Sequence, residues 1–190
     1  MAISSIILLA VIIIFFLWGI STYNKFVKLK TLMEEAWSVI DVFLKKRYDL
    51  IPNLVESVKG YATHERETLE AVILARSNAM GAKDLASKAQ CEGELGGVLG
   101  RLMAITEKYP ELRANENFMS LQNEISKLEV EIERARRYYI GTVRENNIAI
   151  KIFPASIIAN MFKFVAGVFF EIVNKQEKEV PTVNFSNDNK

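Results

Sequence analysis

The stretch NENFMSLQNEISKLEVEIERARRYY, residues 115–139, has the strongest periodicity in the chain. Its apolar residues recur at alternating steps of three and four positions: Phe118, Leu121, Ile125, Leu128, Ile132, Ala135 and Tyr139. This spacing places them on one face of a helix. Asn115 is in position to cap that helix, with Glu116 in its first turn. Continued to Phe153, before Pro154, the helix would be about 57 Å long, so it needs antiparallel helical partners.

The segments before this stretch predict such partners. The first apolar stripe has heptad-like spacing: Phe26, Leu29, Met33, Ala36, Ile40 and Phe43, widened by Trp37 and Leu44. Pro52 predicts a break or kink near residues 49–51, after which a second apolar face continues to about Asn78. The polar residues 82–90 predict a turn or a frayed helix start, and a third helix is expected from Glu92 to Tyr109.

No strand-like alternation competes with these patterns, so we expect an all-α fold. Its parts would be an N-terminal transmembrane helix and a long antiparallel bundle of the four-helix type. The expected domains are a transmembrane anchor over residues 1–22, the helical bundle over 23–174 and a polar, flexible tail over 175–190.

The transmembrane helix is predicted from the first 24 residues, which carry no charged side chain. Residues 3–20 include thirteen Leu, Ile, Val or Phe, and their insertion gains about 4 to 8 kcal/mol. As a helix, residues 2–20 would rise about 28 Å, close to the thickness of the hydrocarbon core. A cleaved signal peptide is the alternative, because Gly19-Ile20-Ser21 offers suitable small residues. The length of the apolar run and the lack of a basic residue before it favour a retained single-pass anchor.

Lysines decide the expected orientation. Lys25, Lys28 and Lys30 follow the apolar run directly, whereas no basic residue precedes it. The positive-inside rule therefore places the C-terminal domain in the cytoplasm. Because the leader is short, an exported orientation stays open.

A second apolar segment, residues 155–173, contains ten Leu, Ile, Val or Phe residues. Lys163 near its centre costs about 2.5 to 3.5 kcal/mol in a bilayer, which offsets most of the gain, and Asn160 and Glu171 add to that cost. We therefore expect a bundle helix or a helix on the membrane surface rather than a second crossing.

Composition excludes several functions. With 24 Lys and Arg against 23 Asp and Glu, the net charge of +1 gives no global field that would attract nucleic acid. One Cys and one His are too few for an internal disulfide, a Cys/His zinc site or a di-iron bundle site. His64-Glu65 begins like a helical zinc motif, but Thr68 stands at the second ligand position.

The other candidate sites are equally weak. Gly93–Arg101 lacks the ending of a phosphate loop, although its glycine spacing would let helices approach closely or else weaken the helix locally. Cys91 lies next to Glu92 and Glu94, which raise rather than lower the pKa of a thiol, so we expect it to be unreactive. We predict no catalytic, cofactor-binding or metal-binding residue, no small-molecule substrate and no enzymatic activity.

Polar residues near Pro52 and late in the fourth predicted helix are expected to form a layer that fixes helix register, with a buried Arg paired to an Asp. The residues concerned are Asp41, Arg47, Asp49, Asn53, Arg136, Arg137, Tyr138 and Tyr139. A surface for docking a partner is the alternative. Trp37 is expected to serve helix packing.

Motifs across residues 23–164 resemble the LemA family. The matching residues are Tyr23-Asn24, Ala36-Trp37-Ser38, Ile40-Asp41-Val42, Leu44-Lys45-Lys46-Arg47, Asp49-Leu50-Ile51-Pro52-Asn53-Leu54-Val55, Val58-Lys59-Gly60-Tyr61, His64-Glu65, Ala75-Arg76, Glu107, Tyr109-Pro110, Leu112, Leu121-Gln122, Leu128-Glu129, Arg136-Arg137-Tyr138-Tyr139, Asn147 and Phe153-Pro154. The chain departs from the family pattern at Ile140, at Asn146 and at the glycines 93, 96, 97 and 100.

The resemblance implies a bacterial protein anchored in the cell (inner) membrane, with an antiparallel helical bundle and no established enzymatic activity. It links members loosely to envelope stress, to neighbouring membrane proteins including a zinc metalloprotease, and in one branch to organelle membranes. We expect a non-enzymatic interaction or scaffold protein that contacts the lipid bilayer and associates with itself or with another membrane protein. The alternatives are an accessory subunit of a membrane protease or envelope stress system, and a membrane-shaping element that uses residues 155–173.

Overall fold

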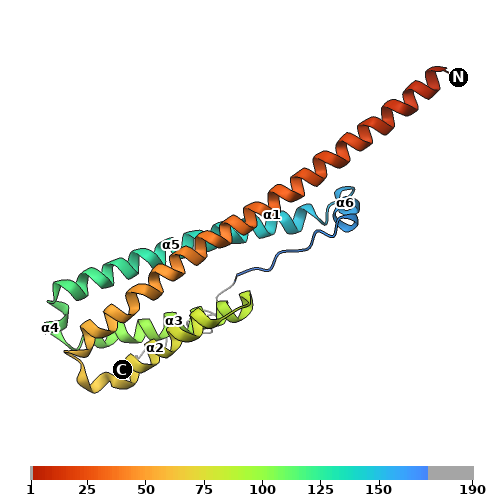
Figure 1. Cartoon of the computed structure of the whole chain (residues 1–190). Coiled ribbons are helices and arrows are strands. Elements are labelled where there is room, and N and C mark those ends of the chain that lie inside the picture. Colours follow the sequence, from red (N-terminus) through yellow and green to blue (C-terminus); the bar gives the residue numbers. More distant parts are fainter. Residues whose placement is uncertain (1, 171–190) are drawn as a thin grey trace, which may run out of the picture.

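The computed structural model describes residues 2–170, and every regular element in that range is helical (Figure 1). The prediction of an all-α fold is therefore confirmed for this part of the chain. The elements are α1 (Ala2–Lys59), η1 (Thr63–Glu65), α2 (Arg66–Gly81), α3 (Leu85–Thr106), α4 (Pro110–Arg113), α5 (Glu116–Ala149) and α6 (Ala155–Met161). The expected tail, 175–190, lies outside the described residues.

Helices α1 and α5 run antiparallel along each other and form the backbone of the molecule (Figure 1). The predicted stripe of α5 is buried, except that Leu121 is only partly so. Asn115 caps α5 as predicted, because its Oδ1 accepts the N–H of Phe118 at 3.0 Å. The helix ends at Ala149 instead of Phe153, since Pro154 has no N–H to offer and restricts the residue before it.

Helix α1 continues through Pro52 to Lys59, so, of the break or kink predicted near residues 49–51, the break is wrong. Pro52 cannot donate to the carbonyl of Tyr48, four residues earlier. That carbonyl instead accepts the Nε–H of Arg76, on α2, at 2.6 Å. The helix stops at Lys59, where the N–H groups of Tyr61 and Ala62 both bond to the Val58 carbonyl at 3.0 Å.

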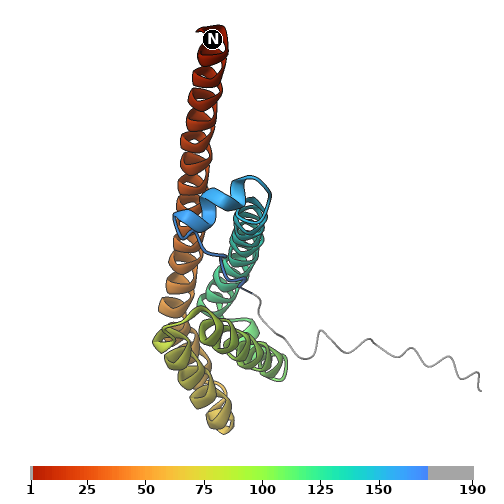
Figure 2. The same cartoon turned by 90° about the vertical axis from the view of Figure 1, so that its right-hand side faces the viewer.

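Helices α2 and α3 form a hairpin beside the end of α1 that is far from the N-terminus (Figures 1 and 2). The predicted turn over residues 82–90 is mostly helix, because α3 begins at Leu85. Asp84 caps it by accepting the N–H of Ser87 at 2.9 Å and the Ser87 hydroxyl at 2.6 Å. These two bonds hold the pKa of the Asp84 carboxyl below its ordinary value. Helix α3 ends at Thr106, three residues before the predicted Tyr109.

The predicted helix over residues 155–173 is wrong for most of its length. Helix α6 covers only Ala155–Met161, and residues 164–170 run as an extended segment back along α1 and α5 (Figures 1 and 2). We call residues 164–170 the strap. Residues 171–173 of the predicted helix lie outside the described residues.

Candidate functional site

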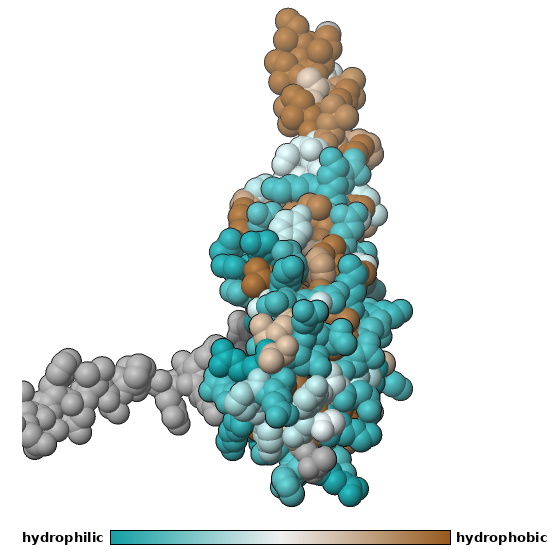
Figure 3. Space-filling view, turned by 90° about the vertical axis from the view of Figure 1, so that its left-hand side faces the viewer, coloured by the Kyte–Doolittle hydropathy of each residue, from teal (hydrophilic) through white to brown (hydrophobic). Residues whose placement is uncertain are grey.

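The N-terminal part of α1 projects alone from the rest of the molecule, as Figure 3 shows for its apolar side chains. All thirteen Leu, Ile, Val and Phe residues between Ile3 and Ile20 are at least 45% exposed. We call residues 3–20 the rod. In residues 2–170, α1 is the one helix long and apolar enough to cross a membrane. Such a surface is unfavourable in water and favourable in lipid, which is compatible with a membrane anchor.

Beyond the rod, one face of α1 is buried in the core. Its buried positions follow a heptad pattern: Phe26, Leu29, Ala36, Ile40, Leu44, Arg47, Ile51, Leu54 and Val58. Arg47 therefore occupies a core position although it is charged. It is 2% exposed, so the guanidinium must find its partners inside the protein.

Those partners are two glutamates on two other helices. Arg47 donates from Nη2 to Glu92 of α3, and from Nη1 to Glu129 Oε1 of α5 at 2.5 Å. Glu92 is itself 2% exposed and also accepts the hydroxyl of Tyr48. Burial raises the pKa of Tyr48 to about 12, against the opposing effect of Arg47, so the hydroxyl stays a proton donor at neutral pH. We call Arg47, Tyr48, Glu92 and Glu129 the ionic layer.

Two further contacts bring α2 and the edge of α3 into this region. Arg76 of α2 binds the Tyr48 carbonyl, as described above. At the surface, Lys88 Nζ lies 3.3 Å from Asp41 Oδ1. The four long helices are therefore tied together at one level of the bundle.

The predicted polar layer does not form from the residues expected: of its eight predicted members, only Arg47 belongs to the ionic layer. Arg47 is buried as expected, yet it pairs with two glutamates and not with an Asp. Asp41 pairs with Lys88 at the surface, and Asp49, Asn53, Arg137 and Tyr138 are exposed. Sequence reasoning does not identify Glu92 as a member of this layer. Its position in phase with Leu95, Leu99 and Leu102 of α3 is the signal that could have done so.

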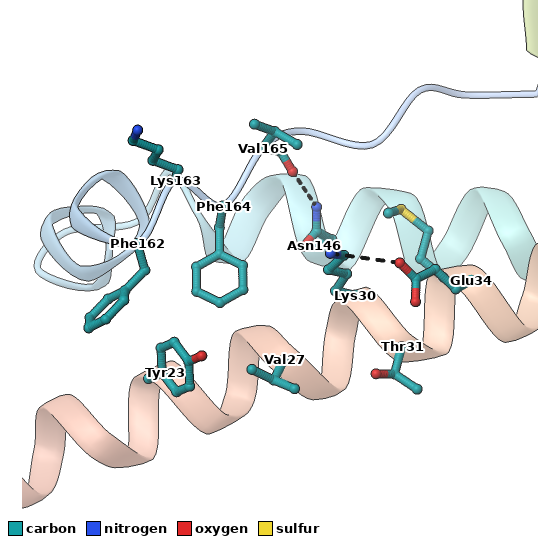
Figure 4. A pocket seen from close by; sticks show the side chains of 11 residues that line it. Tyr23, Val27, Lys30, Thr31, Glu34, Asn146, Phe162, Lys163, Phe164 and Val165 are labelled. Atoms are coloured by element: carbon teal, nitrogen blue, oxygen red, sulfur yellow. Dashed lines mark hydrogen bonds and ion pairs between the residues drawn. The ribbon is translucent and has the colours of Figure 1, made fainter. Parts of the chain in front are cut away.

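The strap is held by side chains of α5 near the rod. Asn147 exchanges two hydrogen bonds with Gly167: its Nδ2 donates to the carbonyl at 3.0 Å, and its Oδ1 accepts the N–H at 2.8 Å. Asn146 donates to the Val165 carbonyl at 3.2 Å (Figure 4). Tyr139 donates to the Val168 carbonyl at 2.9 Å, and burial raises its pKa, which keeps the hydroxyl protonated. Side chains of α5 thus satisfy four backbone groups of the strap: the carbonyls of Val165, Gly167 and Val168 and the N–H of Gly167.

Aromatic rings complete this contact. Phe170, fully buried, lies with its ring centroid 5.2 Å from that of Trp37, which is 5.7 Å from Tyr139. Arg136 lies over the Phe170 ring at 5.7 Å. The prediction that Trp37 serves packing is therefore confirmed. A cleft of about 430 Å³ opens between α1 and residues 162–165, lined among others by Tyr23 and Phe164 (Figure 4).

A larger groove of about 850 Å³ lies at the opposite end, between the last turns of α1 and residues 66–77 of α2. Its apolar residues include Ile73 and Leu74, which are 40% and 62% exposed. Charges of both signs also line it: Glu56, Lys59, Arg66 and Glu70. We call this the distal groove.

The remaining predicted candidates are scattered. His64 is exposed on η1, and Cys91 is a half-buried free thiol on α3. No group of three or more His, Cys, Asp or Glu residues suited to a metal occurs within residues 2–170. An added Cβ at Gly96, Gly97 or Gly100 would meet nothing within 4 Å, so these glycines do not mediate a close helix approach in this chain.

Comparison with known proteins identifies the family. Residues 36–185 match the LemA family. Protein LemA of Metamycoplasma hominis is 24% identical over 175 residues, which cover 92% of this chain and 80% of that protein. Magnetosome proteins MamQ 2 and MamQ 1 of Paramagnetospirillum magneticum are each 28% identical over 80 residues, which cover 42% of this chain and 29% of theirs. Because the family match spans most of the sequence and agrees with the motifs noted above, the chain belongs to the LemA family.

Proposed function

We propose that this chain is a membrane-anchored, non-enzymatic interaction protein that assembles with further copies of itself at the bacterial cell membrane. The observation that carries the proposal is the distal groove, whose exposed Ile73 and Leu74 lie on the same rigid helical scaffold as the rod. An exposed apolar groove with a charged rim is the kind of surface that protein partners cover.

A second copy fits this groove better than a partner of one charge sign. The rim carries two acidic residues, Glu56 and Glu70, and two basic residues, Lys59 and Arg66. An interface between identical patches needs both signs on each copy, because each acidic group must meet a basic one.

The anchor adds a geometric argument. From Ile20 to Val55, α1 rises about 52 Å without interruption, which sets the height of the groove above the membrane. Copies held in one bilayer share this orientation and height. Equal height allows the grooves of two copies to meet when the copies stand side by side.

Two substitutions in the groove test self-association. The full-length protein in mild detergent is compared with Ile73→Glu/Leu74→Glu by light scattering. We expect the wild type to be oligomeric and the variant to be mainly monomeric, because four carboxylates would then face each other across a dimer. Val130→Glu, which replaces a 45% exposed apolar residue on α5, is the matched control and should leave the mass unchanged. A wild-type monomer, or a variant oligomer of unchanged mass, would contradict the proposal.

We further propose a cytoplasmic position for the bundle. The exposed Lys25, Lys28 and Lys30 directly after the rod support it through the positive-inside rule. In a Cys91→Ser background, Val130→Cys, at a 45% exposed position outside the groove, should react with a membrane-impermeant thiol reagent only after the cells are opened. Labelling of intact spheroplasts would place the bundle outside.

A further inference from the structure

The end of the bundle next to the rod has an apolar surface that the packing within the chain leaves uncovered. Its residues lie on the α5–α6 turn and on α6: Ile152, Phe153, Ile157, Met161 and Phe162, which are 54%, 78%, 52%, 61% and 53% exposed. We call these five residues the collar. The opposite face of α6 is buried, with Ile158 7% and Ala159 1% exposed. The helix thus has apolar groups on its outer side as well as its inner side.

Contacts with α1 fix the height of the collar. A Cβ placed on Gly19 would lie 3.9 Å from Cδ1 of Ile158, and the rings of Tyr23 and Phe162 are 4.8 Å apart. Helix α6 therefore lies level with the last turn of the rod, which ends at Ile20. Figure 2 shows the α5–α6 turn at the end of the bundle from which the rod projects. A bilayer that covers the rod up to Ile20 must meet the collar.

The charged residues beside the collar are mostly lysines. Residues 2–33 and 146–170 include five lysines and no Asp or Glu: Lys25, Lys28, Lys30, Lys151 and Lys163. All five are exposed. The nearest acidic residues along α1 and α5 are Glu34, about 21 Å beyond Ile20, and the exposed Glu145, seven residues before Ile152. Apolar side chains flanked by lysines match an interface of acyl chains and anionic headgroups.

We propose that residues 152–162 lie in the headgroup region of the bilayer that the rod spans, where Lys151 and Lys163 bind anionic lipids. The collar then forms a second membrane contact that sets the tilt of the bundle relative to the rod. Trp18 and Tyr23, on the adjacent turns of α1, place amphipathic rings at the same level, as at other membrane interfaces. This inference rests on the membrane anchor in the proposed function but does not depend on self-association.

Depth measurement on the full-length protein tests the proposal. Single cysteines at Ile12, Phe153, Phe162 and Val130, in a Cys91→Ser background, carry a spin label in phosphatidylcholine nanodiscs with about a third phosphatidylglycerol. Val130, 45% exposed on α5 and outside the distal groove, is the matched water-exposed control. We expect labels at Phe153 and Phe162 to collide with oxygen more, and with a water-soluble nickel chelate less, than the label at Val130. The label at Ile12 should lie deepest.

The outcomes separate this proposal from the anchor itself. If Ile12 is in lipid but Phe153 and Phe162 are as water-accessible as Val130, the collar proposal is overturned and the anchor stands. If Ile12 is also in water, the anchor fails and the collar proposal fails with it. Protection of Phe153 and Phe162 in native membranes but not in nanodiscs would show that a protein covers the collar, which also overturns the proposal.

Charge reversal tests the anionic component. Lys151→Glu/Lys163→Glu should make the labels at Phe153 and Phe162 shallower in nanodiscs that contain phosphatidylglycerol, and much less so in pure phosphatidylcholine. The double variant Lys108→Glu/Lys127→Glu, which reverses two exposed lysines outside both the collar and the distal groove, controls for net charge and should have no effect. An equal response in both lipids would overturn the binding of anionic headgroups by these lysines.

Discussion

Different side-chain groups hold the elements together at the two ends of the bundle. At the end far from the rod, four helices meet and charged side chains join them across the core in the ionic layer. At the end near the rod, no further long helix of residues 2–170 lies beside α1 and α5, and the strap packs along these two helices instead. The side-chain groups that bind the strap by hydrogen bonds are neutral: the amides of Asn146 and Asn147 and the hydroxyl of Tyr139.

The difference follows from what each group must bind. A helix has satisfied backbone groups, so only side chains can join it to another helix, and a buried guanidinium with two carboxylates fixes one register. An extended strap has unsatisfied N–H and C=O groups, which an amide can bind with its donor and its acceptor together. The ionic end should therefore be costly to disrupt, whereas the strap should open locally.

The largest expected effect comes from breaking the ionic layer at one side. Arg47→Ala leaves Glu92 buried without its cation and should lower the free energy of unfolding by about 3 to 5 kcal/mol. Arg47→Met/Glu92→Met removes both charges and should recover most of this loss. Urea unfolding of the detergent-solubilised protein, followed by circular dichroism, measures both. A double variant as unstable as Arg47→Ala would show that the unpaired charge is not the cause.

Tyr48→Phe is expected to have the next largest effect. It removes a hydrogen bond to a buried carboxylate, so it should cost about 1.5 to 3 kcal/mol at neutral pH. The pKa of Tyr48 is raised from 10.0 to about 12, so the folded state holds this proton more tightly than the unfolded chain. The resulting stability is complete below pH 10 and is lost as the pH rises to 12. The difference between wild type and variant should therefore shrink over this interval, and a constant difference would refute the account.

Arg76 should contribute less, and its contribution should depend on Pro52. Arg76→Ala leaves the Tyr48 carbonyl without its donor and should cost about 1 to 2 kcal/mol. In a Pro52→Ala background, residue 52 again has an N–H to give to that carbonyl, so the same substitution should cost less. The double-mutant cycle measures this coupling. Additive effects would mean that Arg76 acts independently of the proline.

The smallest effect on global stability is expected at the strap. Asn147→Ala removes both bonds to Gly167 and should cost about 1 kcal/mol. Hydrogen exchange of the Gly167 amide should accelerate by about tenfold, while exchange in α1 stays unchanged. Asn147→Asp can still accept a hydrogen bond from the Gly167 amide but cannot donate one to its carbonyl. Its exchange rate at Gly167 should therefore lie between those of the wild type and Asn147→Ala. Unchanged exchange at Gly167 would show that other contacts hold the strap.

The sequence predicts the ionic end of this comparison better than the strap end. The heptad stripes of α1 and α5 identify their buried faces, because a face that must leave water repeats with the helix period. The burial of Arg47 was expected, but its glutamate partners were not, since they come from helices distant in sequence. The break predicted at Pro52 is wrong for the same reason, because Arg76 on another helix supplies the hydrogen bond that the proline cannot make.

The strap could not be predicted from periodicity. Residues 155–173 are apolar enough for a helix. A hydropathy pattern, however, contains no information on the hydrogen bonds between Asn147 and Gly167, which are distant in sequence. Asn146 stood out only as a departure from the family pattern, and in the structure it binds the Val165 carbonyl. The prediction that the chain lacks catalytic and metal-binding residues stays a prediction.

Native mass spectrometry of the complex extracted from its own membranes in mild detergent, with peptide identification, tests the central claim most directly. The account predicts a discrete assembly of this chain alone, which Ile73→Glu/Leu74→Glu reduces to the monomer. A monomeric wild type would contradict it. A stoichiometric foreign membrane protein, such as a protease, would contradict it as well and would make this chain an accessory subunit of that partner.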